Sequence, residues 1–426
     1  MAHRTYTHQD AYALINALVA ELTGGKSSIQ AYDPSSFVSV GETVLSYGTE
    51  NVMNAIGMLA GKRLADVRPY KSQFSTVRAE NTGIFTQLKG TINYYSDNAL
   101  PDGSTNNQST TNLANGFDNG TNPSGGSAQS TTSMWEQHQP KIAELWFSGS
   151  STWQDALTRY ENQLQQAFRS EDEFMNFWSG VLTEKANDIE SQKEAFDRTA
   201  VLNYIAGIYD MGSNMPGSSV NLTEAYNTEF GSSYTTAQLL GEHLTEFSMF
   251  FAAKVKEISN LMTNRSVNYH WAIPKTVSGV TYKVLRHTPK ANQKMMLLGK
   301  FWDNVEARVR PQIFNEQYIS IGNFVPVTFW QNENNPAAID VKPAIPKVSN
   351  PTEQTAGTRV QLSYVLGIIY DDRAIATDYQ LETVATTPLE ARKLYRTTWW
   401  TFRRNLINNF SHKAVLFYMA DPVSQD

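Results

Sequence analysis

The chain has 426 residues, among them 35 Lys and Arg, 41 Asp and Glu and no cysteine, which gives a formal charge of −6. The absence of cysteine excludes disulfides, thiolate nucleophiles and Cys-ligated zinc or iron-sulfur sites. The acidic balance argues against a protein that grips nucleic acid through a basic face, and no apolar run approaches the ~20 residues of a membrane helix, so we expect a soluble, unexported protein.

The N-terminal region is predicted to form an extended arm. A helical pattern of apolar residues covers 12–22 and ends at Gly24 and Gly25, and a second helical pattern covers 52–64. Between them, residues 29–45 mix Pro, Ser and Gly with scattered apolar residues. This composition suits an arm lying along a surface better than an independent core.

In residues 83–95, Ile84, Leu88, Ile92 and Tyr94 share one parity and polar residues share the other, which predicts a β-strand. A second apolar segment follows at 142–147, after the polar, low-complexity stretch 101–133, which has only two charged residues. We therefore expect a hairpin with a long tip that cannot order itself. A linker between two domains is the alternative.

The strongest helical patterns follow the hairpin. Apolar residues trace one face from 152 to 168, with Thr152 as a possible N-cap. Ser170 and Glu173 resemble a capping box, and an apolar stripe continues to Gly212. An unbroken helix over 171–210 would be about 60 Å long.

The remaining segments predict a mixed region that makes the fold α+β. A loop rich in Gly and Ser is expected at 212–219, a helix at 237–262, and a further helix from Thr387, as N-cap, to Asn409. Strand-like segments cover 267–273, 277–285 with a turn at Ser278 and Gly279, 295–298, 318–330, 339–345, 360–370 and 412–420.

The sequence contains no convincing catalytic or cofactor site. Its seven histidines are scattered, and His3 and His8 are too far apart in sequence to share a helical face as metal ligands. No phosphate-binding glycine loop or nucleophile elbow occurs. Asp371 and Asp372 are adjacent at the end of a predicted strand, so they point to opposite faces and are expected to bond a turn or a neighbour. We expect no enzyme, no cofactor and no metal.

Charged residues make up only 18% of the chain, whereas 12% are aromatic. Surfaces covered by other subunits are depleted in charge and enriched in aromatic side chains, which favours a protein that assembles. A monomer with an uncharged polar surface is the alternative.

Three C-terminal segments carry a family resemblance. They are GIIYDDRAIATDY at 367–379, TTPLEARKLYRTTWW at 386–400 and NFSHKAVLFYMAD at 409–421. Together with the order of arm, hairpin, long helix and mixed domain, they resemble the major capsid proteins of tailed bacteriophages, which have the Hong Kong 97-like fold.

The resemblance implies how the chain is divided. Its parts would be an N-terminal arm at 1–65, an extended loop hairpin at 66–150, a peripheral domain with a spine helix at 151–236, an axial domain at 237–365, and a return to the peripheral domain at 366–426 through a C-terminal helix and strand. Neither a fused scaffold nor a crosslinking motif is apparent.

The resemblance also implies function and partners. The chain would self-assemble through hexamers and pentamers into an icosahedral head around double-stranded DNA, with portal, scaffolding or decoration proteins as partners. Assembly would take place in the host bacterial cytoplasm, and the packaged DNA would be touched only loosely. The residues expected at subunit interfaces are Phe85, Lys89, Tyr94, Tyr95, Trp146, Phe147, Trp399 and Trp400.

Two other functions stay open. One is the shell of an encapsulin-like nanocompartment, which resembles the same fold but encloses enzymes. The other is a carbohydrate-binding or glycoside-active protein that uses aromatic residues such as Trp135 and Trp146.

Overall fold

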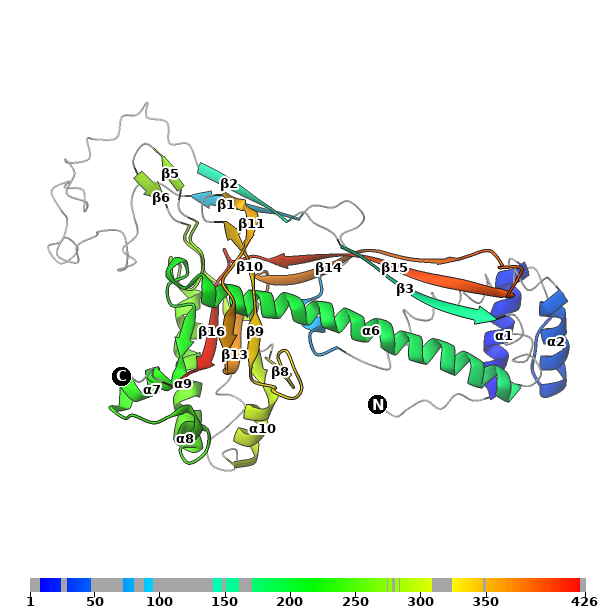
Figure 1. Cartoon of the computed structure of the whole chain (residues 1–426), viewed down its shortest axis with the longest axis horizontal. Helices are drawn as coiled ribbons and strands as arrows, with labels where there is room; N and C mark the ends of the chain where they lie inside the picture. Colours follow the sequence, from blue (N-terminus) through cyan, green and yellow to red (C-terminus); the bar gives the residue numbers. More distant parts are fainter. Residues whose placement is uncertain are drawn as a thin grey trace. The chain divides into compact units, whose positions relative to one another are not determined.

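The computed structural model describes residues 8–23, 29–46, 72–79, 88–94, 141–147, 151–160, 171–273, 275–277, 280–282, 284–308, 324–347 and 350–421 (Figure 1). Helices and strands both contribute strongly, which confirms the predicted α+β class. The chain divides into two compact units. Unit 1 comprises 1–86, 149–197 and 377–406, and unit 2 comprises 87–148, 198–376 and 407–426.

Two helices of unit 1 come from the N-terminal region, α1 (His8–Thr23) and α2 (Pro34–Ser46). The first confirms the predicted helix. The second corrects the expectation of an arm without a core, because Phe37 of α2 is fully buried and lies 6.3 Å from the Tyr12 ring of α1. Asp33 and Ser36 cap α2 reciprocally, since the Ser36 N–H donates to the Asp33 carboxylate and the Asp33 N–H to the Ser36 hydroxyl. The helix predicted at 52–64 lies outside the described residues.

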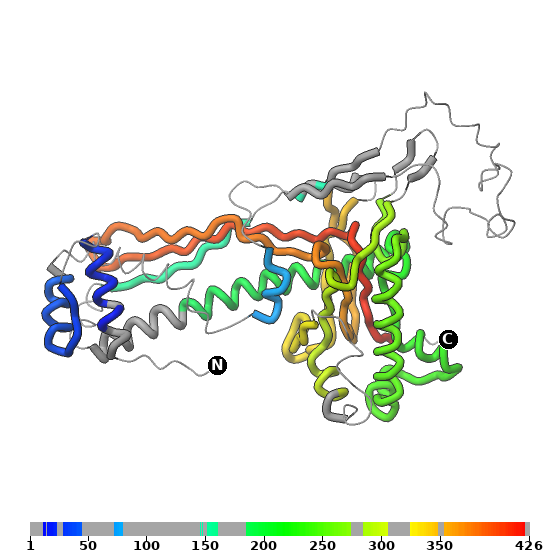
Figure 2. Tube along the Cα trace, turned by 180° about the vertical axis from the view of Figure 1, so that it is seen from behind, coloured from blue at the N-terminus to red at the C-terminus, as the bar shows by residue number. Residues whose placement is uncertain are grey.

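The long helix α6 (Glu171–Asp210) has 40 residues and confirms the predicted helix over 171–210. Its residues up to Asp197 belong to unit 1 and the rest to unit 2. In unit 1, α6 accompanies the strands β3 (Ser151–Tyr160), β14 (Ile375–Thr386) and β15 (Tyr395–Asn408), as Figure 2 shows. β15 is the central strand of this sheet and pairs antiparallel with β3.

The helix expected at 152–168 is wrong over its described part, because 151–160 forms the strand β3. The inner face of β3 carries Trp153, Asp155, Leu157 and Arg159 in alternation. Two of these four residues are charged, so the apolar/polar alternation that identifies a strand is hidden. The remaining apolar residues happen to match a helical spacing.

The helix expected from Thr387 to Asn409 is also wrong. Thr387, Pro388 and Glu390 belong to a turn, in which the N–H of Leu394 donates to the Glu390 carbonyl and Leu394 has a φ of 50°. The strand β15 follows. The capping signals occur equally in turns, and the run RTTWWTF is rich in residues that favour strands.

Unit 2 is built on a five-stranded sheet in the order β4-β16-β13-β7-β8. β13 pairs antiparallel with both β16 and β7, whereas the outer pairs β16–β4 and β7–β8 are parallel. The predicted strands at 295–298, 360–370 and 412–420 are confirmed within this sheet and its neighbour. The bounds are β4 (Ser219–Asn221), β7 (Gln293–Leu298), β8 (Phe324–Val327), β13 (Tyr364–Asp371) and β16 (Ala414–Met419).

In the described part of unit 2, four α-helices accompany the end of α6. The helix predicted at 237–262 is divided at Gly241 into two, and the helices before and after it were not predicted. Phe251 forms edge-to-face contacts with Phe301 and Phe417, each at 5.6 Å, which ties helices to the sheet. The bounds are α7 (Leu222–Phe230), α8 (Thr236–Leu240), α9 (Leu244–Thr263) and α10 (Gly299–Arg308).

Smaller two-stranded sheets complete unit 2. β1 (Leu88–Tyr94) and β2 (Lys141–Phe147) pair antiparallel, which confirms the predicted hairpin, and its tip at 101–133 lies outside the described residues. β5 (Lys275–Val277) and β6 (Val280–Tyr282) form the hairpin predicted around 278–279. The strand expected at 267–273 is irregular instead. The other pairs join β9 (Ile339–Val341) to β12 (Val360–Leu362) and β10 (Ala344–Lys347) to β11 (Asn350–Ala356).

Candidate assembly surface

The inner face of the β14-β15-β3 sheet is built on α6. Trp400 and Phe402 of β15 are buried against Ile189 of α6, with Trp153 and Leu157 of β3 packed at their side. The Trp153 and Phe402 rings stack at 5.0 Å. Aromatic pairs of this kind contribute beyond their buried area. The sheet therefore packs against α6 through this face.

Cations from α6 and β15 bind over the aromatic rings of this inner face. Lys185 forms an ion pair with Asp155 and lies 5.5 Å from the Trp400 ring. Lys193 lies 5.0 Å from the Phe402 ring and pairs with Glu382 of β14. These contacts hold the long helix and the sheet in one register.

Arg159 is an unusual member of the inner face. Its residue is buried, and its Nη2 donates to the Thr398 hydroxyl at 2.5 Å. Burial lowers the pKa of Arg159 to about 10. In the strand register, Arg159 lies opposite Arg396. Its hydrogen bond to Thr398 is a polar contact that favours this alignment of β3 and β15.

A buried ion cluster anchors the segment 72–79 to the same unit. Asp197 of α6 is fully buried and accepts hydrogen bonds from Arg78 Nε and from the Thr377 hydroxyl, both at 2.7 Å. Arg78 also donates to Glu190 at 2.9 Å, and the Ala79 N–H donates to the Thr377 carbonyl. Burial raises the pKa of Asp197, and the charge of Arg78 opposes that rise.

The outer face of β3 and β15 has a different composition. Thr397 and Thr158 bond through their hydroxyls at 3.0 Å, and the Tyr160 and Tyr395 rings meet edge to face at 6.0 Å. Trp399 lies between these pairs and Thr401, and 40% of it is exposed. The outer face therefore carries an uncharged patch of Thr, Tyr and Trp. We call it the Trp399 patch, and its members are Gln154, Ala156, Thr158, Tyr160, Tyr395, Thr397, Trp399 and Thr401.

The predicted interface residues are divided between the two units. Trp399 and Trp400 lie in unit 1, on opposite faces of β15, whereas the hairpin belongs to unit 2. In that hairpin the backbone register places Lys89 opposite Trp146, Tyr94 opposite Lys141, and Phe147 opposite Leu88. Phe85 and Tyr95 lie outside the described residues. Sequence reasoning missed the rest of the Trp399 patch, although the strand-favouring run RTTWWTF could have revealed it.

The adjacent carboxylates bond neighbours as predicted, but the expectation that they point to opposite faces is wrong, because both line one cavity. Asp371 ends β13 and accepts a hydrogen bond from the Thr288 hydroxyl at 2.7 Å, and Asp372 accepts one from the Asn292 amide at 2.9 Å. Among the described residues, no group of His, Asp and Glu is arranged to hold a metal ion. In the same part of the chain, no helix combines the length and apolar character of a membrane span.

No family model and no curated protein matches the chain. Solved structures do. A chain in the capsid structure of Staphylococcus phage Andhra is 10% identical with a TM-score of 0.49, over 83% of this chain and 86% of that one. A chain in the mature capsid of bacteriophage PhiM1 is 7% identical with a TM-score of 0.43, over 84% of this chain and 89% of that one. A chain in the capsid of Cyanophage Pam1 is 12% identical with a TM-score of 0.41, over 84% of this chain and 94% of that one. All three come from phage capsids, the class that the sequence resemblance names.

Proposed function

We propose that this chain is the major capsid protein of a tailed bacteriophage, a structural subunit and not an enzyme. It would assemble with copies of itself into an icosahedral shell around double-stranded DNA. The virion would be its final location and the host cytoplasm its place of assembly. Portal, scaffolding or decoration proteins would join the same shell.

The observation that carries this proposal is the two-sided sheet of unit 1. Its inner face is closed by α6, and its outer face presents the uncharged Trp399 patch. Trp and Tyr are enriched in the centres of protein interfaces, where they contribute much of the binding free energy. A large aromatic side chain that stays 40% exposed among the uncharged residues of the Trp399 patch suits a surface that another subunit covers.

The β1–β2 hairpin supports the same reading. Among the described residues it forms a sheet of two strands, with β2 close to β11, and a two-stranded ribbon is marginally stable in water on its own. A contact with a second copy would stabilise it. Repeated heterologous contacts of this type close into a shell when the rotation between neighbours permits closure.

Electron microscopy of the purified full-length protein tests the proposal. We expect closed particles of uniform size, formed by the protein alone or after addition of a scaffolding protein from the same virus. A protein that sediments as a monomer under every such condition would contradict the shell function. The particle contents then decide between the alternatives, because DNA indicates a virus head and an enclosed enzyme indicates a nanocompartment.

A further inference from the structure

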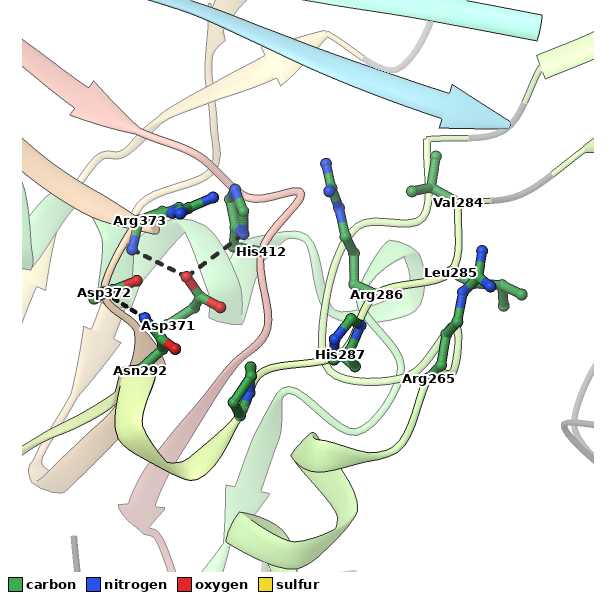
Figure 3. Close-up of a pocket in the computed structure, with 11 residues that line it drawn as sticks. Arg265, Val284, Leu285, Arg286, His287, Asn292, Asp371, Asp372, Arg373 and His412 are labelled. Atoms are coloured by element: carbon green, nitrogen blue, oxygen red, sulfur yellow. Dashed lines mark hydrogen bonds and ion pairs between the residues drawn. The ribbon is translucent and has the colours of Figure 1, made fainter. Parts of the chain in front are cut away.

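Unit 2 contains a cavity of about 510 Å³ between three segments of the chain (Figure 3). Arg265 follows α9, residues 284–292 lead into β7, and the third wall combines the end of β13 with His412 before β16. In Figure 3, Arg373, His412 and the two aspartates lie on one side, and Arg286, His287 and Arg265 lie on the other. The volume is typical of a small-molecule site.

Backbone pairing places two of the arginines at the same wall. Ser266 and Arg286 form an isolated antiparallel bridge, with N–H to carbonyl distances of 3.0 and 3.1 Å. Arg265, next to Ser266, and Arg286 therefore start from neighbouring backbone positions. Arg373 comes from the opposite wall, and both Arg265 and Arg373 are exposed. Guanidinium groups thus approach the cavity from two sides.

The acidic residues of the cavity are engaged within its wall. Asp371 is buried and bonds the Thr288 hydroxyl through Oδ2 and the Arg373 N–H through Oδ1, at 2.7 and 3.0 Å. Asp372 accepts a hydrogen bond from Asn292 through Oδ2, whereas its buried Oδ1 has no hydrogen-bond partner. The exposed charged groups of the lining are consequently basic.

His412 lies among charges of both signs, because its Nδ1 is 3.6 Å from Asp371 Oδ1 and two arginines stand near it. Burial, followed by the charges of Arg286 and Arg373, lowers the pKa of His412 to about 3. Counting histidines as neutral, three arginines and two aspartates give the lining a formal charge of +1, in a chain whose total is −6. The cavity is therefore a local basic site in an acidic protein.

We infer that this cavity binds a small phosphate-class oxyanion through Arg265, Arg286 and Arg373. The planar guanidinium fork matches the spacing of phosphate oxygens and forms charge-assisted hydrogen bonds with them. A recess of this size admits phosphate or pyrophosphate but not a DNA duplex. The inference concerns a single subunit and does not depend on the proposed shell function.

Isothermal titration of the full-length protein with pyrophosphate, at constant ionic strength, tests this site. We expect saturable binding with one site per chain, weakened about tenfold or more in Arg373→Gln and in Arg265→Gln, as loss of a charged hydrogen bond predicts. Lys256→Gln is the matched control, because it removes an exposed charge of α9 outside the cavity. Circular dichroism checks that each variant is folded. If Arg373→Gln is not folded, the affinity of Arg265→Gln for pyrophosphate decides the test.

Three results would overturn the inference. The first is the absence of saturable binding by the unmodified protein. The second is an equal loss in Lys256→Gln, which would show general charge attraction. The third is displacement of pyrophosphate by a short DNA duplex at equal phosphate concentration, which would assign the binding to an open surface.

Discussion

Trp399 and Trp400 are neighbours in β15 with opposite environments, since 40% of Trp399 is exposed and only 3% of Trp400. Successive side chains of a strand point to opposite faces, so Trp400 packs on Ile189 of α6 while Trp399 joins the outer patch. In the expected helix they would lie about 100° apart, with one facing the subunit core and the other a neighbour. Burial of Trp400 in the subunit core is established, and a contact of Trp399 with a second subunit is a prediction.

Trp399→Thr should impair assembly without impairing folding. Thr suits a strand and matches its neighbours in the patch, so the sheet should persist. Loss of one aromatic anchor at an interface typically costs about 2 kcal/mol, roughly 30-fold in an association constant. Light scattering during assembly and urea unfolding of the unassembled protein measure the two effects. Normal assembly by Trp399→Thr would remove the patch from the interface.

Trp400→Ala should act in the opposite way. Removing a buried Trp typically costs about 3 to 5 kcal/mol, because the surrounding side chains fill the cavity only partly. The cation of Lys185 would also lose its ring partner. We expect a lower urea midpoint in the unassembled protein. An unchanged midpoint would show that α6 and the sheet are not held together by this cluster.

Arg78→Gln should destabilise unit 1 in a pH-dependent manner. It leaves the Asp197 carboxylate buried without its cation, and breaking a buried pair costs about 3 kcal/mol or more. Burial already raises the folded pKa of Asp197, and the variant raises it further. The folded variant then binds more protons than the unfolded chain, so its stability should fall as pH rises above the ordinary carboxyl pKa of 3.8 and through the raised folded pKa.

A second substitution separates this charge effect from lost packing. Asp197→Asn added to Arg78→Gln removes the uncompensated carboxylate, so the double variant should lose the additional pH dependence. Urea unfolding at several pH values, arranged as a double-mutant cycle, measures the coupling. Additive effects of the two substitutions at every pH would show that Arg78 and Asp197 do not act as a pair.

The sequence correctly predicts those elements in which the apolar residues of the pattern are also the residues that are buried. The strands around Ile368 and Leu416 are continuous apolar runs, as expected for strands inside a sheet, and α6 has a long apolar stripe. In β3 and β15 the pattern fails because Asp155, Arg159 and Arg396 face inward. Their partners on other segments make burial possible, and single-sequence periodicity contains no information about such partners.

The candidate surface was only partly predictable for a related reason. Aromatic composition and the adjacent tryptophans singled out Trp399, but a helical interpretation gave it the wrong neighbours. Thr158 and Tyr160 join the patch only through the register of β3 against β15. Likewise, the cavity arginines share no local motif, because more than a hundred residues separate Arg265 from Arg373 in the sequence.

His270 should make the unassembled protein less stable at acidic pH. It is fully buried, with its Nε2 2.9 Å from the Val284 carbonyl. Burial, aided by the charges of Lys413 and Arg286, lowers its pKa from 6.5 to about 4. Between pH 6.5 and 4 the unfolded chain binds more protons than the folded protein. The free energy of unfolding should therefore decrease as the pH is lowered from about 6.5 to 4, and this residue accounts for about 3 kcal/mol of the decrease.

The comparison with His270→Gln isolates that contribution. The variant should lose this share of the slope between pH 6.5 and 4, and His287→Gln, at an exposed histidine, is the matched control. His412, with a pKa lowered to about 3, acts in the same direction and stays present in both variants. Equal pH profiles for the unmodified protein and His270→Gln would contradict the assignment.

Gly367→Ala should destabilise the central sheet of unit 2. Gly367 lies in β13 between Leu297 of β7 and Phe417 of β16. A Cβ at this position would lie 2.6 Å from the Met296 carbonyl oxygen, and that oxygen belongs to backbone that cannot rotate away. Overpacking of this kind costs about 1 to 3 kcal/mol.

Gly212→Ala is the matched control, because a Cβ there meets no atom within 4 Å. By restricting the unfolded chain, this change should be neutral or stabilise the protein by about 0.5 kcal/mol. Urea midpoints of the two variants should therefore move in different directions from the unmodified protein, or by clearly different amounts. Equal midpoints would mean that β13 can shift away from β7 to admit a methyl group. The close approach of these two strands would then be incidental, and the glycine that opens the motif at 367–379 would have no packing role.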